Sequence, residues 1–234
     1  MKKQGFTTRS LNIPYSKEDP HKALQMPLYD SVAFEFDSAE QIAANFRGEY
    51  VAHVYSRASS PTVEYFELKL KALSQSHGVV AVSSGMAAIS NTLMAVAKSG
   101  DNIISENHLF GHTYALLNQT LPDLGIETHF SDLLNPQEIE KLIDNNTRAI
   151  FFETVTNPQL EIADIEMLSE ICKKHKLLLI ADSTITPPNV FKAGSFGVNI
   201  EVISTTKYIS GGATLFGGAI IDHGNFNWEL NPNF

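Results

Sequence analysis

The sequence predicts an α/β fold in which a mostly parallel sheet of seven strands lies between layers of helices. Two observations predict it. Short apolar runs of strand length alternate with segments whose apolar residues recur at helical spacing. The 234 residues, 43% hydrophobic and 18% charged, have ordinary globular composition and are enough to bury a substantial core. Because such sheets bind ligands outside the carboxyl ends of their strands, functional residues are expected directly after the apolar runs.

Residues 1 to about 60 show weak periodicity and predict an extended arm with one helix near Ala39–Phe46. An arm rich in exposed aromatic residues often packs on a partner subunit. We therefore expect this arm to make oligomer contacts. Its aromatic residues are Tyr15, Tyr29, Phe34, Phe36, Tyr50 and Tyr55.

The regular pattern begins at Pro61. The segment TVEYFELKLKALS is amphipathic, with Phe66, Leu70 and Leu73 on one helical stripe. Further helices are predicted to begin near Gly85, Gly111, Pro136 and Ile165. The predicted strands are Val79–Ser83, Asn102–Ser105, Ile126–Phe130, Ala149–Glu153, Leu177–Ala181, Glu201–Ser204 and Gly217–Asp222.

Composition excludes several classes of function. The formal net charge is −9, and clustered basic residues, which nucleic acids require, are missing. The sequence has no apolar stretch of bilayer-spanning length and no signal-peptide core at its start, so a cytoplasmic enzyme or binding protein is expected. The single cysteine, Cys172, excludes an internal disulfide framework and is expected to be a core residue.

Polar residues follow three of the predicted strands. Ser84 and Gly85 open a helix directly after a strand, where backbone N–H groups and the helix dipole favour a phosphate; an N-cap alone is the alternative. Asp182 ends the apolar run LLLIAD, where a carboxylate can pair with a cationic ligand atom or serve only as a turn residue. Asn157 precedes a proline, which by itself indicates only a loop.

The segment STTKYISGG follows the sixth predicted strand. Ser204 and Thr206 alternate along the chain, so in a strand their hydroxyl groups face the same way, and Lys207 comes next. Hydroxyl groups and a helix N-terminus around an anion, with a lysine and a carboxylate nearby, suit a phosphorylated aromatic aldehyde cofactor. The lysine forms a Schiff base, and the carboxylate keeps a ring nitrogen protonated so that the ring withdraws electrons.

Taken in order from the YSR motif at Tyr55–Arg57 to the strand GGAIID, these motifs resemble the Cys/Met-metabolism (trans-sulfuration) family of pyridoxal-phosphate (PLP) enzymes. The resemblance implies the aspartate-aminotransferase-like fold, also called fold type I. It also implies that Lys207 forms the Schiff base with pyridoxal 5'-phosphate, that Asp182 pairs with the pyridine nitrogen, and that Asn157 binds the ring hydroxyl.

The same resemblance implies how the cofactor phosphate is held. Backbone N–H groups and hydroxyl groups of one subunit contact it, and Tyr55 and Arg57 reach it from the neighbouring subunit. A homodimer is then needed for a complete site, and the family usually forms a tetramer. The implied contacts within one subunit come from Ser84, Gly85, Met86, Ser204 and Thr206.

Several positions depart from the family pattern. The tyrosine that usually stacks on the cofactor ring is replaced by Phe110, which stacks but offers no phenol for proton transfer. Tyr114 substitutes only if the helix turns it inward. Asn199 and Gly212 stand where Asp and His are common, and SSPT replaces SNPT.

The largest departure is length. The family continues beyond the last sheet strand with the rest of this domain and a smaller C-terminal domain, which holds the arginine expected for the substrate carboxylate. We therefore expect residues 1–60 to be an arm, residues 61–234 an incomplete PLP-binding domain, and the C-terminal domain to be absent. Such a chain is expected to bind PLP with little turnover.

The branch of the family that the TLFGGAIID and LFGHTY stretches resemble most is O-acetylhomoserine sulfhydrylase, which implies γ-replacement with sulfide or a thiol in methionine biosynthesis. Methionine γ-lyase and the cystathionine γ-synthases and lyases remain alternatives, as does a non-catalytic fragment that only binds PLP or oligomerises. A serine acyl-enzyme on Ser204 and Lys207 lacks its further motifs. His108 and His112 lack a third metal ligand, so no metal is expected.

Overall fold

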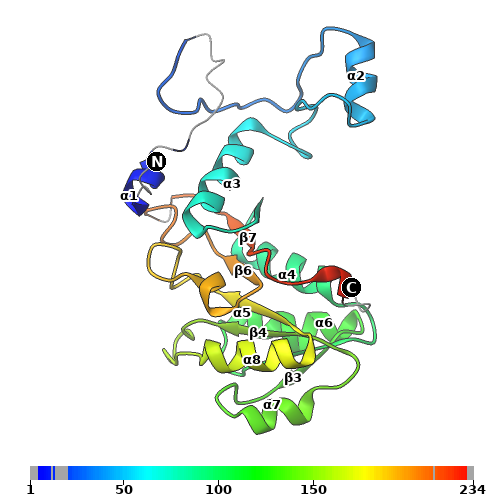
Figure 1. The fold of residues 1–234 in the computed structure, drawn as a ribbon, viewed down its shortest axis with the longest axis vertical. Coiled ribbons are helices and arrows are strands. Elements are labelled where there is room, and N and C mark those ends of the chain that lie inside the picture. The colour runs from blue at the N-terminus through cyan, green and yellow to red at the C-terminus, as the bar shows by residue number, and fades with distance from the viewer. Residues whose placement is uncertain (1–4, 12, 14–20, 213, 231–234) are drawn as a thin grey trace. The chain divides into compact units, whose positions relative to one another are not determined.

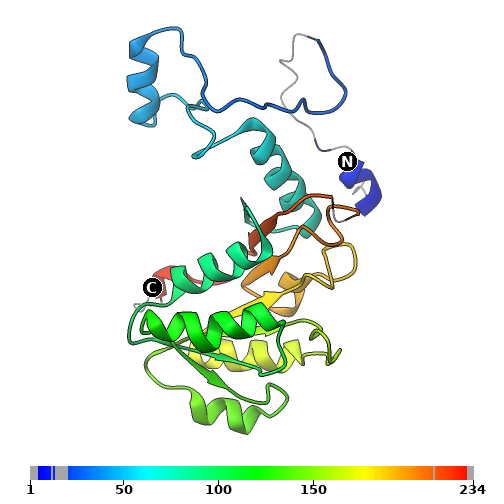
Figure 2. The same ribbon diagram turned by 180° about the vertical axis from the view of Figure 1, so that it is seen from behind.

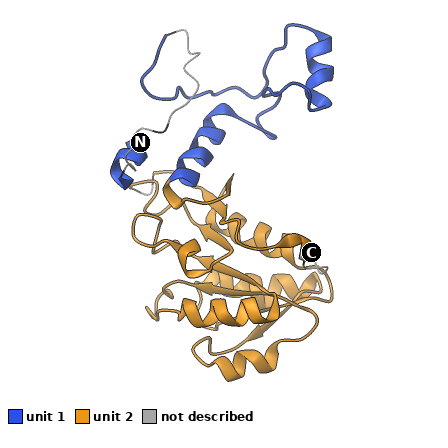
Figure 3. Ribbon diagram, in the orientation of Figure 1, with its two compact units in different colours: residues 1–72 blue, residues 73–234 orange. Residues whose placement is uncertain are grey.

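The computed structural model describes residues 5–11, 13, 21–212 and 214–230; the predicted arm residue Tyr15 lies outside them. The chain divides into two compact units, residues 1–72 and 73–234, drawn in blue and orange in Figure 3. The sequence predicts a division near residue 60, on the basis of expected function: an oligomerisation arm before it and a cofactor-binding domain after it. That assignment of roles stays a prediction.

The first unit holds helices α1 (Phe6–Leu11) and α2 (Ala39–Phe46) and most of α3 (Pro61–Ser74). Helix α2 has the predicted bounds because Ser38 caps it by accepting a hydrogen bond from the N–H of Gln41 at 3.2 Å. Helix α1 was not predicted. Its six residues, FTTRSL, bury no side chain and carry no helical apolar stripe.

The second unit is built on one seven-stranded sheet with the order β1-β7-β6-β5-β4-β2-β3. Only β7 runs antiparallel to its neighbours, so the predicted mostly parallel sheet is confirmed. The predicted bounds of Asn102–Ser105 are those observed, and the other predicted strands differ by at most two residues at either end. The strands are β1 (Gly78–Val82), β2 (Asn102–Ser105), β3 (Glu127–Phe130), β4 (Thr147–Glu153), β5 (Leu178–Asp182), β6 (Ile200–Ile203) and β7 (Gly218–Asp222).

Helices cover both faces of this sheet, as Figures 1 and 2 show from opposite sides. One face is covered by α4 (Gly85–Val96), α5 (Gly111–Ala115), a π-helical turn η1 (Leu116–Thr120) and α6 (Leu121–Asp123). The other is covered by α7 (Pro136–Leu142) and α8 (Ile165–His175). Short 3₁₀ turns η2 (Ala193–Phe196) and η3 (Trp228–Leu230) complete the unit.

The central strands are mostly apolar because both of their faces are buried. Ile103 packs with the helix α4 side, whereas its neighbour Ile104 packs with the α8 side. Phe151 and Phe152 divide in the same way, and all four side chains are fully buried. Burying each such side chain contributes about 1.5–3 kcal/mol. This two-sided core fixes the strands, and therefore the edge at which β1 to β6 all end.

The segment after β6 differs from the prediction. Ser204 and Thr206 were expected to alternate in a strand, but β6 ends at Ile203 and residues 205–211 form consecutive turns. The turn is stabilised by the Ser210 N–H, which donates to the Thr205 carbonyl at 2.9 Å. The hydroxyl groups of Ser204 and Thr206 are therefore placed by a turn and not by the alternation of a strand.

Candidate active site

A cavity of about 220 Å³ opens at the carboxyl ends of the parallel strands. Every predicted cofactor residue of the second unit lines it, although these residues are spread over more than a hundred positions of sequence. Six residues that were not predicted also line it: Ile89, Glu153, Val155, Thr184, Ile185 and Phe216. The predicted residues in its wall are Ser84, Gly85, Met86, Phe110, Asn157, Asp182, Ser204, Thr206 and Lys207.

The wall formed by the start of α4 suits an anion. Ser84 is the N-cap, and its hydroxyl oxygen accepts from the Ala87 N–H at 3.0 Å. The first N–H groups of a helix have no intrahelical acceptor, so those of Gly85 and Met86 remain at the cavity wall. A Cβ atom on Gly85 would lie 2.6 Å from the Cβ atom of Ser204. Glycine therefore lets the helix start and the Ser204 hydroxyl share one small space. These groups fit a phosphate.

Thr206 is already engaged by the protein. Its hydroxyl group donates a hydrogen bond to the Gly217 carbonyl at 3.2 Å. The same hydroxyl oxygen accepts a hydrogen bond from the Gly217 N–H at 3.1 Å. These bonds join the turn after β6 to the start of β7. A contact from this hydroxyl to a phosphate would require the donated bond to Gly217 to be given up. Ser204 is held differently, because its backbone N–H donates to the Thr184 hydroxyl oxygen at 2.9 Å.

Asp182 ends β5 in the floor of the cavity. Its Oδ1 accepts the Thr184 N–H at 2.9 Å, which is the turn role that the sequence allowed. Burial raises the pKa of this carboxyl group, and the negative charge of Glu201 raises it further. No cationic side chain in the described part of the chain makes a salt bridge with Asp182. A desolvated carboxylate without a cation fits the protonated ring nitrogen of PLP.

Lys207 lines the same cavity and its side chain is otherwise exposed. Phe110 is 42% exposed and contributes an aromatic face to the wall. Tyr114 packs its ring 5.2 Å from the ring of Phe130 and joins the core beneath α4, so it does not line the cavity. The cavity wall therefore has an aromatic ring at this position without a phenol.

Glu153 is the charged residue among the cavity residues that the sequence did not single out. It ends β4, is 4% exposed, and accepts the backbone N–H groups of Phe110 at 2.7 Å and Asn157 at 3.1 Å. Burial raises the pKa of its carboxyl group to about 7. The only signal in the sequence was an acidic residue at the end of the apolar run AIFFE.

Tyr55 and Arg57 belong to the first unit. The Arg57 guanidinium lies 5.2 Å from the centre of the Tyr55 ring, and Tyr55 is 43% exposed. Tyr55 also forms an isolated β-bridge with Ala33. Their contact with a phosphate bound in a second copy of the chain stays a prediction.

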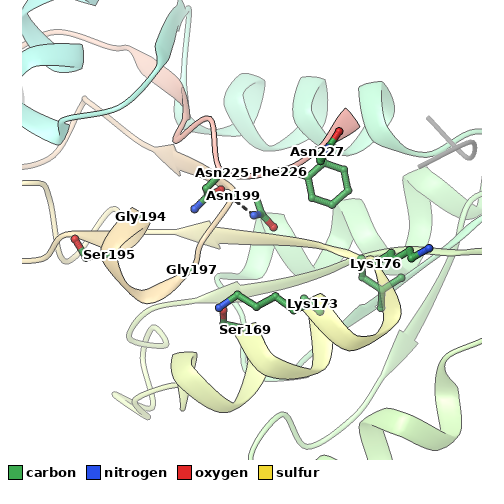
Figure 4. Close-up of a pocket in the computed structure, with 12 residues that line it drawn as sticks. Ser169, Lys173, Lys176, Gly194, Ser195, Gly197, Asn199, Asn225, Phe226 and Asn227 are labelled. Atoms are coloured by element: carbon green, nitrogen blue, oxygen red, sulfur yellow. Dashed lines mark hydrogen bonds between the residues drawn. The ribbon is translucent and has the colours of Figure 1, made fainter. Parts of the chain in front are cut away.

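A larger cavity, of about 550 Å³, lies at the opposite edge of the sheet, where the parallel strands begin (Figure 4). Its amides serve the fold. Asn199 accepts the Leu179 N–H at 2.8 Å and donates to Asn225, which in turn donates to the Val198 carbonyl. Ligands of parallel sheets bind at the other edge, so the smaller cavity is the candidate site.

The remaining candidate residues have structural roles. His108 lies 2.8 Å from Glu161, which raises the pKa of the imidazole, and the ring of His112 lies 5.3 Å from that of Phe110. Within the described residues, no three acidic, histidine or cysteine side chains are grouped to hold a metal. Cys172 is 2% exposed, as expected for a core residue, and burial raises the pKa of its thiol. None of the described helices has the length and apolar character needed to cross a membrane.

Comparison with known proteins decides the family. The family model of the Cys/Met metabolism PLP-dependent enzymes matches residues 7–234. The chain belongs to this family. Its cofactor is therefore PLP, in agreement with the groups that line the smaller cavity.

Curated relatives carry two different activities. An L-methionine gamma-lyase of Fusobacterium nucleatum is 38% identical over 222 residues, covering 94% of this chain and 56% of the relative. An O-acetyl-L-homoserine sulfhydrylase of Corynebacterium glutamicum is 37% identical over 232 residues, covering 98% of this chain and 53% of the relative. The chain thus spans about half the length of the curated relatives it matches.

Solved structures confirm the fold. A protein assigned as an O-acetylhomoserine (thiol)-lyase of Campylobacter jejuni superposes with a TM-score of 0.89 at 37% identity, over 94% of this chain and 55% of that one. That structure contains N'-pyridoxyl-lysine-5'-monophosphate. An O-acetylhomoserine sulfhydrylase of Wolinella succinogenes is 46% identical over 75% of this chain and 50% of its own, with a TM-score of 0.70. The predicted fold type I architecture is confirmed.

Proposed function

We propose that this chain forms the cofactor-binding part of a PLP-dependent O-acetylhomoserine sulfhydrylase. In the proposed reaction, sulfide or a thiol replaces the acetoxy group at Cγ of O-acetylhomoserine: the Cγ–O bond breaks, a Cγ–S bond forms, and homocysteine or methionine and acetate result. The observation that carries this choice is Phe110 in the cavity wall at the position where the family usually has tyrosine.

Phe110 favours a leaving group that needs no proton. A carboxylate has a pKa of about 4, so acetate departs as a stable anion at neutral pH. A thiolate has a pKa of about 8.5 and departs more easily when an acid protonates it. Since Phe110 has no phenol and Tyr114 packs in the core, neither of these two aromatic residues supplies such an acid in the cavity wall.

The other residues of the cavity take their roles from their chemistry. Bound PLP supplies an aldehyde that condenses with amines and a protonated ring that withdraws electrons. The Lys207 amine binds it covalently and, once a substrate amine takes its place, removes the proton from the substrate Cα. Asp182 holds the proton on the ring nitrogen, Asn157 binds the ring hydroxyl, and Ser204 with the start of α4 binds the phosphate.

Lys207 must be neutral to accept that proton. We further propose that Tyr55 and Arg57 of a second copy complete the phosphate site, so that the working enzyme is at least a homodimer.

Methionine γ-lyase is the second candidate, because the Fusobacterium relative of that name is about as similar to this chain as the Corynebacterium sulfhydrylase. The two are separated by assaying a whole protein that contains this chain with O-acetylhomoserine plus sulfide, and in parallel with methionine alone. We expect homocysteine and acetate as the dominant products. Release of 2-oxobutyrate from methionine as the faster reaction would contradict the proposal.

A further inference from the structure

Glu153 joins two loops of the cofactor cavity. One carboxylate oxygen, Oε1, accepts the backbone N–H of Phe110 at 2.7 Å, and the other, Oε2, accepts that of Asn157 at 3.1 Å. Phe110 follows β2 and Asn157 follows β4, so one side chain ties together the ends of two neighbouring strands. The backbone N–H of Glu153 itself donates to Oε1 of Glu106 at 3.1 Å.

The surroundings of Glu153 are costly for a carboxylate. The residue is 4% exposed, and no cationic side chain among the described residues makes a salt bridge with it. Burial raises the pKa of its carboxyl group, and the negative charges of Asp182 on β5 and Glu106 after β2 raise it further. Lys207 is the cationic residue that lines the same cavity. An unpaired buried carboxylate destabilises a fold unless hydrogen bonds compensate for the lost water. Both carboxylate oxygens of Glu153 accept hydrogen bonds from backbone N–H groups of the cavity wall.

We propose that Glu153 is a positioning residue for PLP, which fixes the backbone of Phe110 and Asn157 relative to each other. Phe110 presents the aromatic face and Asn157 the amide of the cavity wall, and their separation sets the space for the cofactor ring. The inference rests on the proposed assignment of this cavity to PLP. It goes beyond that assignment because Glu153 acts through two backbone bonds on residues that themselves touch the cofactor.

A purely structural role makes a different prediction. If Glu153 only stabilised the end of β4, replacing it would lower the melting temperature of the apoprotein and leave PLP affinity unchanged. A positioning role links the two hydrogen bonds to the cofactor. On replacement of Glu153, the N–H groups of Phe110 and Asn157 would then exchange faster with solvent. PLP would bind more weakly and with a less ordered geometry.

The test uses Glu153→Gln. Glutamine keeps the shape but has one acceptor oxygen and one NH₂ group, so it retains only one of the two backbone bonds. In the apoprotein we expect amide hydrogen exchange at Phe110 or Asn157 to be about tenfold faster. We expect PLP to bind about tenfold more weakly, with a smaller visible circular dichroism signal from the bound cofactor. Glu161→Gln is the matched control, because Glu161 is half exposed and pairs with His108 outside this cavity.

A second variant, Glu153→Asp, keeps the charge but is shorter by one methylene and cannot reach both N–H groups. It should weaken PLP binding in the same direction, which keeps the test valid if Glu153→Gln does not fold. Unchanged exchange at both amides, or wild-type PLP affinity and dichroism in both variants, would overturn the positioning role. A wild-type chain that binds no PLP at all would instead refute the proposed function, and the positioning role with it.

Discussion

Gly85 and Ser204 touch so closely that a β-carbon on Gly85 would lie 2.6 Å from the Cβ atom of Ser204. Carbon atoms do not approach to this distance, so Gly85→Ala must push the start of α4 away from the turn after β6. Because both segments are assigned to the phosphate, we expect PLP to bind at least about tenfold more weakly, as measured by titration of the cofactor absorbance.

The control for this substitution is Gly78→Ala. A Cβ atom at Gly78 meets nothing within 4 Å, and Gly78 begins β1 at the edge of the sheet away from the cavity. Its PLP affinity should stay within about twofold of the wild type. Equal affinities for the two alanine variants would argue against a phosphate at the Gly85–Ser204 contact.

Asp182→Asn should separate stability from cofactor binding. The amide oxygen keeps the bond from Thr184, and a neutral side chain removes the cost of a buried carboxylate, whose pKa is raised in the folded state. The apoprotein should therefore be no less stable above neutral pH. PLP affinity should fall about tenfold to a hundredfold, because a charge-assisted bond to the ring nitrogen is lost.

Asp222→Asn is a matched control for this change. Asp222 also ends a strand and accepts the N–H two residues ahead, that of Gly224 at 2.8 Å, but it lies at the opposite edge of the sheet. Its PLP affinity should be unaffected. If Asp182→Asn binds PLP as the wild type does, Asp182 is not the partner of the ring nitrogen.

Glu106 and Glu153 predict how the stability of the apoprotein depends on pH. Burial raises the pKa of each carboxyl group from 4.5 to about 7. Between these values the folded state binds more protons than the unfolded state, so the free energy of unfolding falls as pH rises from about 5 to about 7. Urea unfolding at several pH values measures this slope.

Glu106→Gln should make that slope shallower, since it removes one titrating group and keeps an acceptor for the Glu153 N–H. Glu127→Gln, on the exposed start of β3, should leave it unchanged. A Glu106→Gln protein with the full wild-type slope would show that Glu106 titrates near its ordinary pKa.

Phe110→Tyr tests why the proposed substrate carries an acetyl group. A phenol in the cavity wall supplies a proton donor for a thiolate leaving group, so breakdown of methionine to 2-oxobutyrate should rise about tenfold or more in the whole enzyme. The reaction of O-acetylhomoserine with sulfide should change less. Phe226→Tyr, whose ring lines the cavity at the opposite edge, serves as the control. An unchanged ratio of the two activities would argue against leaving-group protonation as the basis of specificity.

The sequence predicted the sheet well because buried strands are apolar over their full length and end in polar residues. Asp182 and Lys207, which line one cavity, were predicted as site residues for the same reason, since each follows such a run and its charge is unusual there. Glu153 was missed because it reads as the last residue of a buried strand, and its two bonds reach residues 43 and 4 positions away. The turn that holds Thr206 was missed because its bonds to Gly217 span 11 positions.

The most direct test of the account is to trap the cofactor on Lys207. The purified chain is mixed with PLP, reduced with borohydride, digested and examined by mass spectrometry, with Lys207→Ala and Lys173→Ala in parallel. We predict a phosphopyridoxyl group on the peptide that contains Lys207, present in Lys173→Ala and lost in Lys207→Ala. A cofactor adduct that persists in Lys207→Ala, or a wild-type chain that forms none, would contradict the account.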